Sequence, residues 1–162
     1  MAITTGDSLP GAALLKLGEE GPETVRLEEK LKGRKVAIFA VPGAFTGVCT
    51  TAHMPSFIRT REQFAEKGVA DVLCICVNDP FVAQAWAETT GASEAGIEVL
   101  ADPEGAYTAA IGMDFTAAAA GLIGRSRRYA MLVDDGRVTA LHVEESPGTC
   151  EATAGEALLA EL

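Results

Sequence analysis

The sequence has few basic residues, and it has no hydrophobic run long enough to cross a membrane. Its 162 residues include 13 Lys and Arg against 23 Asp and Glu, so the formal net charge is −10. A membrane-spanning helix needs about 18 or more apolar residues in succession, and no such run occurs here. Nucleic acids and anionic lipid surfaces bind basic patches. We therefore expect no transmembrane helix, and neither nucleic acid nor a membrane as the main partner.

The N-terminal segment also lacks the features of a secretory signal. The residues MAITTGDSLPG contain neither a basic head nor an apolar stretch, so we expect a cytoplasmic protein. With 48% hydrophobic residues, disorder is excluded as the default state. The length fits one domain over residues 1–162.

Cysteine is scarce and irregularly spaced, with four residues: Cys49, Cys74, Cys76 and Cys150. These are too few for a disulfide scaffold. A structural zinc site takes four ligands in two close pairs, and the chain has no C-x-x-C pair and only two histidines. We therefore expect no metal. In the cytosol, thiols stay reduced unless they are catalytic or redox-sensing, so the question is which thiol reacts.

Apolar runs and helical periods alternate through the first two thirds of the chain. Continuous apolar runs predict buried strands at 34–41 and 72–77, and Ile97-Glu98-Val99-Leu100 predicts a third strand. Helical patterns follow each of them, at 48–67, at 80–91 behind the Asn78-Asp79-Pro80 start signal, and at 104–111. This order predicts parallel strands joined by helices.

The last third of the chain has a different pattern. An Asp-Gly turn at 135–136 joins apolar runs at 128–133 and 138–143 and predicts a β-hairpin, and a short helix follows at 156–159. Residues 1–30 are polar and predicted to be loop-rich, and 116–124 show no clear period. The whole pattern predicts an α/β protein of thioredoxin-like type, with a mixed central sheet flanked by helices.

Cys49 occupies the position where such folds place their chemistry. Functional groups of open α/β sheets lie at the carboxyl ends of the strands, and the first central strand ends at Val41. With Thr46 as helix N-cap, Cys49 is the third helical residue, where the helix N-terminus stabilises a thiolate. His53 lies one turn further on the same face and is interpreted as a hydrogen-bonding residue. An ordinary buried cysteine is the alternative interpretation of Cys49.

The other thiols have different surroundings. Cys74 and Cys76 are two apart in a predicted strand and share one face, where packing is the favoured role because buried thiols are usually inert. Cys150 follows Ser-Pro-Gly-Thr before the last helix. The glycine and proline permit this loop to open locally, and the role of Cys150 stays open.

The segment VPGAFTGVCT at 41–50 resembles the P-x-x-x-T-x-x-C motif of peroxiredoxins, closest to the peroxiredoxin-5 or type II (atypical) subgroup. Gly47 stands where that subgroup usually has proline, so we expect a more flexible loop. The resemblance covers nearly the whole chain in the same order, with further matches at 53–55 (HMP), 76–82 (CVNDPFV), 100–103 (LADP) and 125–129 (RSRRY).

The resemblance implies a thiol-dependent peroxidase that reduces hydrogen peroxide and alkyl hydroperoxides. The Cys49 thiolate would attack the peroxide and become a sulfenic acid. Thr46 and Arg128 would stabilise the developing charge, Pro42 would shield the thiolate, and neither a metal nor an organic cofactor is implied. Arg127 is the alternative to Arg128, since neighbouring strand residues point to opposite faces.

The resemblance also bears on the neighbouring arginine, the reductant and the assembly. For Arg125 we favour a solvated surface charge. Glutathione or glutaredoxin is the favoured reductant, with thioredoxin as another, and either Cys150 or Cys74 could act as a resolving cysteine. Such proteins commonly form homodimers through loops near the active site, where Phe45 or Phe81 could contribute.

Two further hypotheses use the same thiol. A non-enzymatic redox sensor or holdase would change its partner binding when Cys49 is oxidised. A thioredoxin-like disulfide reductase is disfavoured, because Thr46 occupies the first position of the would-be C-x-x-C motif.

Overall fold

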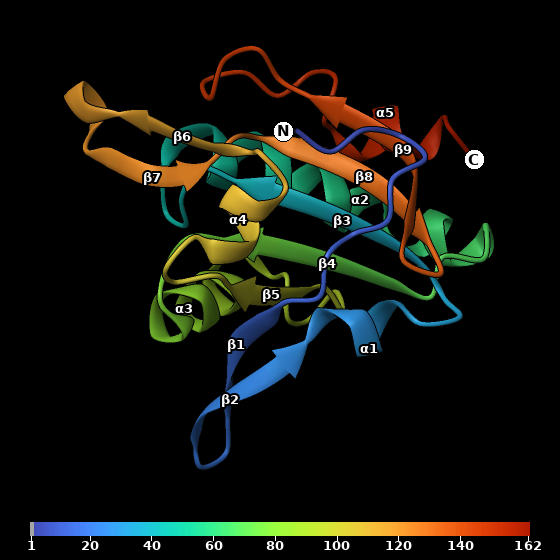
Figure 1. Cartoon of the computed structure of the whole chain (residues 1–162), viewed down its shortest axis with the longest axis horizontal. Coiled ribbons are helices and arrows are strands. Elements are labelled where there is room, and N and C mark those ends of the chain that lie inside the picture. Colours follow the sequence, from blue (N-terminus) through green and yellow to red (C-terminus); the bar gives the residue numbers. More distant parts are fainter. Residues whose placement is uncertain (1) are drawn as a thin grey trace.

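A seven-stranded mixed sheet forms the centre of the computed structural model, which describes residues 2–162 (Figure 1). Its order is β2-β1-β5-β4-β3-β8-β9. The strands are β1 (Ala13–Gly18), β2 (Gly21–Arg26), β3 (Lys35–Val41), β4 (Asp71–Cys76), β5 (Glu98–Ala101), β8 (Tyr129–Asp134) and β9 (Arg137–Val143). Strands β3, β4 and β5 are parallel, whereas β8 pairs antiparallel with β3 and β9 pairs antiparallel with β8. This arrangement confirms the predicted fold class.

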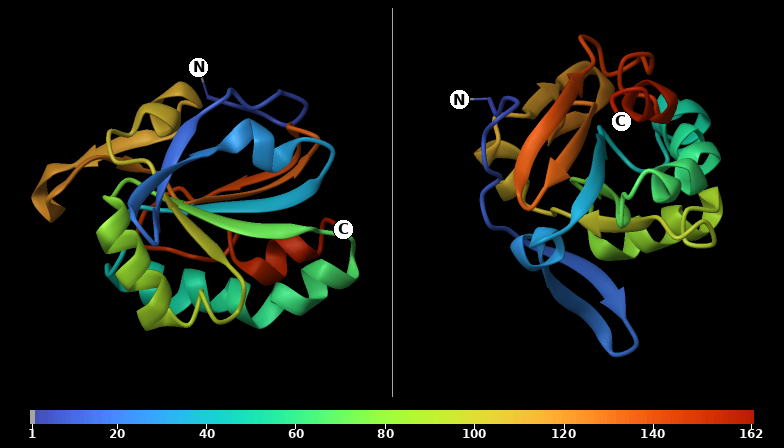
Figure 2. Two further views of the ribbon diagram at one scale, coloured as in Figure 1. Left: turned by 90° about the horizontal axis from the view of Figure 1, so that it is seen from below. Right: turned by 90° about the vertical axis from the view of Figure 1, so that its right-hand side faces the viewer.

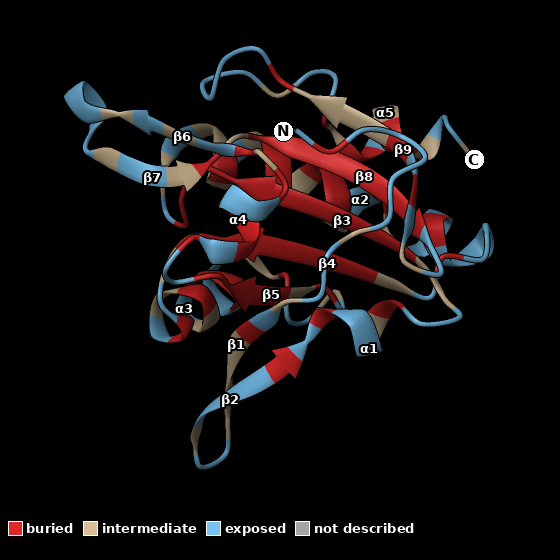
Figure 3. Cartoon of the chain, viewed as in Figure 1, coloured by how far each residue is buried: buried red, intermediate tan, exposed pale blue. Residues whose placement is uncertain are grey.

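Helices cover both faces of the sheet (Figure 2). One face carries α2 (Met54–Glu66), α3 (Pro80–Thr90) and α5 (Gly155–Leu159), and the other carries α1 (Leu27–Leu31) and α4 (Ala106–Ala110). Phe57 and Trp86 pack on the first face, and Leu27 and Tyr107 pack on the second. Because β3 and β4 are covered on both sides, they are buried along nearly their whole length (Figure 3). Among residues 2–162, no helix has the length and apolarity to cross a bilayer.

The turn and cap signals act as predicted. The Asp79 carboxylate accepts a hydrogen bond from the Val82 backbone N–H at 2.8 Å and begins α3, and Gly91 ends it in a left-handed conformation with φ of 86°. Asp135 and Gly136 have φ angles of 49° and 81°. These positive values suit the two-residue turn that joins β8 and β9.

One prediction was wrong, and one hairpin was not predicted. The region 1–30, predicted to be loop-rich, contains the β1–β2 hairpin and most of α1, and the 116–124 region, which has no clear period, lies in a second hairpin. That hairpin consists of β6 (Asp114–Ala117), a 3₁₀ turn η2 (Ala118–Ala120) and β7 (Leu122–Ser126), and it extends away from the body of the protein (Figure 1). Both hairpins are largely exposed. Strands with little buried surface need no continuous apolar run, so their sequences lack the signal.

Candidate active site

Cys49 lies in the helical turn that follows β3, as predicted. The chain turns helical at Gly47 and forms a π-helical turn, η1 (Cys49–His53), in which the Met54 N–H donates to the Cys49 carbonyl. This turn leads directly into α2. The Cys49 side chain is 1% exposed. A π-helical turn inside an α-helix often marks a functional site, and the sequence did not predict it.

The Arg128 guanidinium contacts the Cys49 sulfur. Arg128 directly precedes β8 and is buried. Its Nη2 donates to Cys49 Sγ at 3.2 Å and to the Pro147 carbonyl at 2.9 Å, and its Nη1 donates to His53 Nδ1 at 2.9 Å. A guanidinium fixed at this distance donates one N–H to the sulfur and presents further N–H groups beside it.

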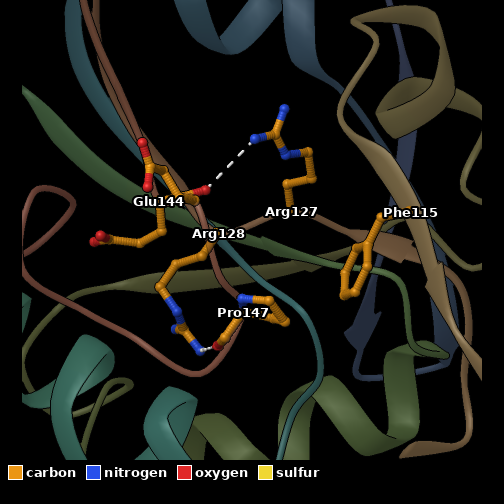
Figure 4. A pocket seen from close by; sticks show the side chains of 6 residues that line it. Phe115, Arg127, Arg128, Glu144 and Pro147 are labelled. Atoms are coloured by element: carbon orange, nitrogen blue, oxygen red, sulfur yellow. Dashed lines mark hydrogen bonds between the residues drawn. The ribbon is translucent and has the colours of Figure 1, made fainter. Parts of the chain in front are cut away.

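Arg127 points elsewhere. Arg127 and Arg128 diverge in Figure 4, and Arg127 Nη2 lies 3.5 Å from the Glu144 carbonyl. Together with Phe115, Glu144, Glu145 and Pro147, the two arginines line a cavity of about 150 Å³ beside the buried guanidinium. Of the two arginines, the structure therefore brings Arg128 to Cys49.

His53 is a neutral positioning group in this arrangement. It is fully buried beside Phe39 and Phe57, with ring centroids 4.9 and 5.7 Å away. Burial, followed by the charge of Arg128, lowers the pKa of His53 to about 3. Its Nδ1 accepts from Arg128, which leaves the Nε2–H to donate to the Thr153 carbonyl at 3.0 Å. The imidazole thus orients the arginine and is uncharged at neutral pH.

Thr46 and Pro42 lie in the loop between β3 and Cys49. The Thr46 carbonyl accepts the first helical bond from the Thr50 N–H at 3.1 Å, as a residue at the N-cap does. Its hydroxyl, however, donates to the Gly43 carbonyl at 2.7 Å instead of to the Cys49 sulfur. Pro42 is buried. In this structure the Thr46 hydroxyl therefore closes the loop onto Gly43 and does not donate to the sulfur.

Two residues that support this loop were missed from the sequence. Arg125, at the end of the β6–β7 hairpin, was expected to be a solvated surface charge, but its Nη1 donates to the Pro42 carbonyl at 3.3 Å. A Cβ at Gly43 would lie 2.7 Å from this nitrogen, so the glycine leaves room for the arginine at the Pro42 carbonyl. Asn78 accepts the Ala44 N–H at 3.0 Å. Asn78 lies in the helix-start signal Asn78-Asp79-Pro80, whereas Arg125 follows the 116–124 stretch, which has no clear period.

The remaining cysteines differ in accessibility. Cys74 and Cys76 are fully buried in the same core cluster, and burial raises the pKa of Cys74 well above its ordinary range and that of Cys76 to about 12. Cys150 is half-buried in the loop between β9 and α5, and burial raises its pKa despite the Thr153 hydroxyl. All four cysteines are free thiols in this structure.

A thioredoxin-like fold with a buried cysteine in a first helical turn, bound by a buried arginine, defines a thiol-based redox enzyme. The sequence model of the Redoxin family matches residues 4–159. The mitochondrial peroxiredoxin-2F of Arabidopsis thaliana is 40% identical over 159 residues, which cover 94% of this chain and 79% of the relative.

Solved structures of peroxiredoxins are also similar to this chain. Reduced Prx3 from Vibrio vulnificus in complex with H₂O₂ has a TM-score of 0.89 at 42% identity, over 98% of both chains. Peroxiredoxin 5 from Alvinella pompejana has a TM-score of 0.84 at 32% identity, over 98% of this chain and 96% of that one. The chain belongs to the peroxiredoxin family. It is a thiol-dependent peroxidase, and the family acts on hydroperoxides with thioredoxin-type reductants.

Proposed function

We propose that Cys49 is the nucleophile of this peroxidase and that Arg128, Thr46 and Pro42 complete its reactive site. The observation that carries the proposal is the 3.2 Å contact between Arg128 Nη2 and Cys49 Sγ, made inside the protein. The arginine is held on the sulfur by two other partners, His53 and Pro147. The preorganised donor therefore needs little rearrangement when charge develops.

The reaction follows from these positions. The Cys49 thiolate attacks one peroxide oxygen, an S–O bond forms and the O–O bond breaks. The sulfur is oxidised by two electrons to a sulfenic acid, and the other oxygen leaves as water or an alcohol after taking a proton. Arg128 binds the oxygen that gains charge, and the Thr46 hydroxyl turns from Gly43 to assist. Pro42 shields the sulfur, and the substrates are hydrogen peroxide and alkyl hydroperoxides.

An external thiol completes the cycle in our proposal. Glutathione or glutaredoxin reduces the sulfenic acid directly, with thioredoxin as the second choice. Cys150 is the intramolecular alternative, because it lies in a half-buried loop. Cys74 is disfavoured as a resolving thiol, since its burial and raised pKa oppose formation of its thiolate.

We also propose a homodimer in the cytoplasm. Phe45 and Phe81 are 52% and 60% exposed, and both lie on loops or helix starts near Cys49, so they would form the contact. The cytoplasm supplies the thiol reductants that the cycle needs. Sedimentation of the wild type and of Phe81→Ser tests the dimer: a monomeric wild type would overturn it.

Peroxide consumption with a thiol reductant tests the main proposal. Cys49→Ser is expected to lose activity, and the matched control Cys74→Ser is expected to keep it. A wild-type protein that consumes peroxide no faster than free cysteine would refute the proposal and favour a sensor or holdase. Mass spectrometry after peroxide treatment without reductant then identifies the resolving route. An oxygen adduct on Cys49 indicates an external thiol, and loss of two hydrogens with a Cys49–Cys150 cross-link indicates Cys150.

A further inference from the structure

Glu144 has a buried carboxylate that closes a loop beside the active site. It directly follows β9, its backbone N–H donates to the Arg128 carbonyl at 3.0 Å, and it is 8% exposed. Its Oε2 accepts hydrogen bonds from the Glu151 N–H at 2.9 Å, the Thr153 N–H at 2.8 Å and the Thr153 hydroxyl at 2.6 Å. One carboxylate oxygen thus ties the two ends of residues 144–153 together. We call this segment the Glu144 loop.

The charge on Glu144 is consistent with this arrangement. Burial acts to raise the pKa of the carboxyl, but hydrogen bonds from Thr153, Glu151 and Ala152 outweigh it and hold the pKa below its ordinary value. Glu144 is therefore ionised at neutral pH, and an ionised acceptor makes stronger hydrogen bonds than a neutral one.

The Glu144 loop contacts the active site through two backbone carbonyls. The Pro147 carbonyl accepts from Arg128 Nη2 at 2.9 Å, and the Thr153 carbonyl accepts from His53 Nε2 at 3.0 Å. His53 in turn binds Arg128 Nη1. Because backbone carbonyls move with the loop, the position of Arg128 depends on the conformation of residues 144–153. Pro147 itself is exposed, so little packing holds its carbonyl in place.

We propose that Glu144 is a positioning residue for the peroxide reaction: its carboxylate fixes the Glu144 loop and thereby holds Arg128 on Cys49. Glu144 acts at a distance from the reacting atoms and makes no contact with the sulfur. The inference rests on the proposed roles of Cys49 and Arg128. It adds that opening of this loop, which also carries Cys150, loosens the arginine.

The peroxide reaction of a Glu144→Ala variant tests the proposal. Trp86 is the single tryptophan of the chain, and its Nε1 donates to the Thr50 hydroxyl at 3.0 Å, next to Cys49. Its fluorescence in a stopped-flow instrument therefore reports oxidation of Cys49. We expect Glu144→Ala to lower the second-order rate constant with hydrogen peroxide by about ten- to a hundred-fold, as misplaced catalytic groups do. The matched control Glu151→Ala removes an exposed carboxylate of the same loop, outside the cavity lining, and keeps the wild-type rate.

Three further measurements separate positioning from general damage. Glu144→Gln keeps an acceptor oxygen and is expected to recover part of the rate. Alkylation of Cys150 in Glu144→Ala is expected to be faster than in the wild type, because the loop opens. In an Arg128→Lys background, Glu144→Ala is expected to add little further loss, since both changes act on the same contact.

Several outcomes would overturn the proposal. The proposal fails if Glu144→Ala keeps the wild-type peroxide rate while Cys150 is alkylated rapidly. It also fails if the losses of rate from Glu144→Ala and Arg128→Lys are fully additive in the double variant. If Glu144→Ala does not fold, Thr153→Val removes the hydroxyl bond to Glu144 at nearly constant volume, together with a 3.9 Å contact to Cys150 Sγ. A smaller loss in the same direction supports the proposal, and an unchanged rate beside faster Cys150 alkylation refutes it. Activity retained in Cys49→Ser would instead refute the proposed function itself.

Discussion

Replacing Arg128 by lysine gives the sharpest prediction for the active site. The guanidinium uses two nitrogens to bind Cys49 and His53 at 3.2 and 2.9 Å. A lysine ammonium keeps the positive charge, but its single nitrogen cannot hold both partners and also face a peroxide oxygen. Loss of one preorganised donor in a comparable site costs about 2.7–4 kcal/mol of transition-state stabilisation. We therefore expect the second-order rate constant with hydrogen peroxide to fall by about a hundred-fold or more.

Stopped-flow fluorescence of Trp86 under excess peroxide measures this constant, and direct peroxide consumption checks it. The control is Arg127→Lys, because Arg127 carries the same charge one residue away but reaches only the Glu144 carbonyl, at 3.5 Å. The control is expected to react like the wild type. A wild-type rate in Arg128→Lys would show that positive charge in this region suffices. An equal loss in both variants would show that the effect does not depend on the contact with Cys49.

Three other predictions concern the loop, the packing and the pH dependence. Gly43→Ala places a Cβ 2.7 Å from Arg125 Nη1, so we expect the Arg125 side chain to leave the Pro42 carbonyl. The rate constant with peroxide is then expected to fall by about ten-fold. A wild-type rate would contradict a role of Arg125 in supporting the loop. Gly155→Ala places a Cβ 2.6 Å from the Ser56 carbonyl oxygen. Urea unfolding is expected to show a free energy of unfolding lower by about 1–3 kcal/mol. An unchanged midpoint would show that α5 can shift to make room. The pKa of His53 is lowered from 6.5 to about 3 on folding. As the pH falls, His53 is therefore protonated in the unfolded chain at a higher pH than in the folded protein. Stability is complete above pH 6.5 and falls as the pH drops, by about 1.4 kcal/mol per unit for this group. Urea midpoints of His53→Gln are expected to fall less steeply with pH, and parallel curves would refute the assignment.

The sequence predicted those parts of the fold that are fully buried or that are determined by residues close together in the chain. Strand β3 is an unbroken apolar run because both of its faces are covered. Asp79 and Gly136 carry cap and turn chemistry that acts within three residues. Strand β2 has one buried residue, Val25, and therefore no pattern to detect.

The active site likewise contains residues that the sequence predicted and features that it did not. Cys49 and Arg128 were found through a motif, and the structure places them in contact. Glu144 was missed because its partners, two backbone N–H groups and the Thr153 hydroxyl, lie seven to nine residues further on in a loop without a regular pattern. The π-helical turn was missed because the choice between i+4 and i+5 bonds depends on what packs against the turn. The direction of the Thr46 hydroxyl likewise depends on the loop and not on the motif.

The separation between Cys49 and its arginine has a consequence for how the protein is made. The two residues are 79 positions apart, and Arg128 reaches the sulfur only after β8 has paired with β3. During synthesis the thiol therefore leaves the ribosome well before the arginine that contacts it, since chains emerge from the N-terminus at about 5–20 residues per second. If Arg128 activates Cys49 as proposed, a chain whose sheet is incomplete reacts with peroxide more slowly than the folded protein. Partly folded chains would then be spared oxidation at Cys49.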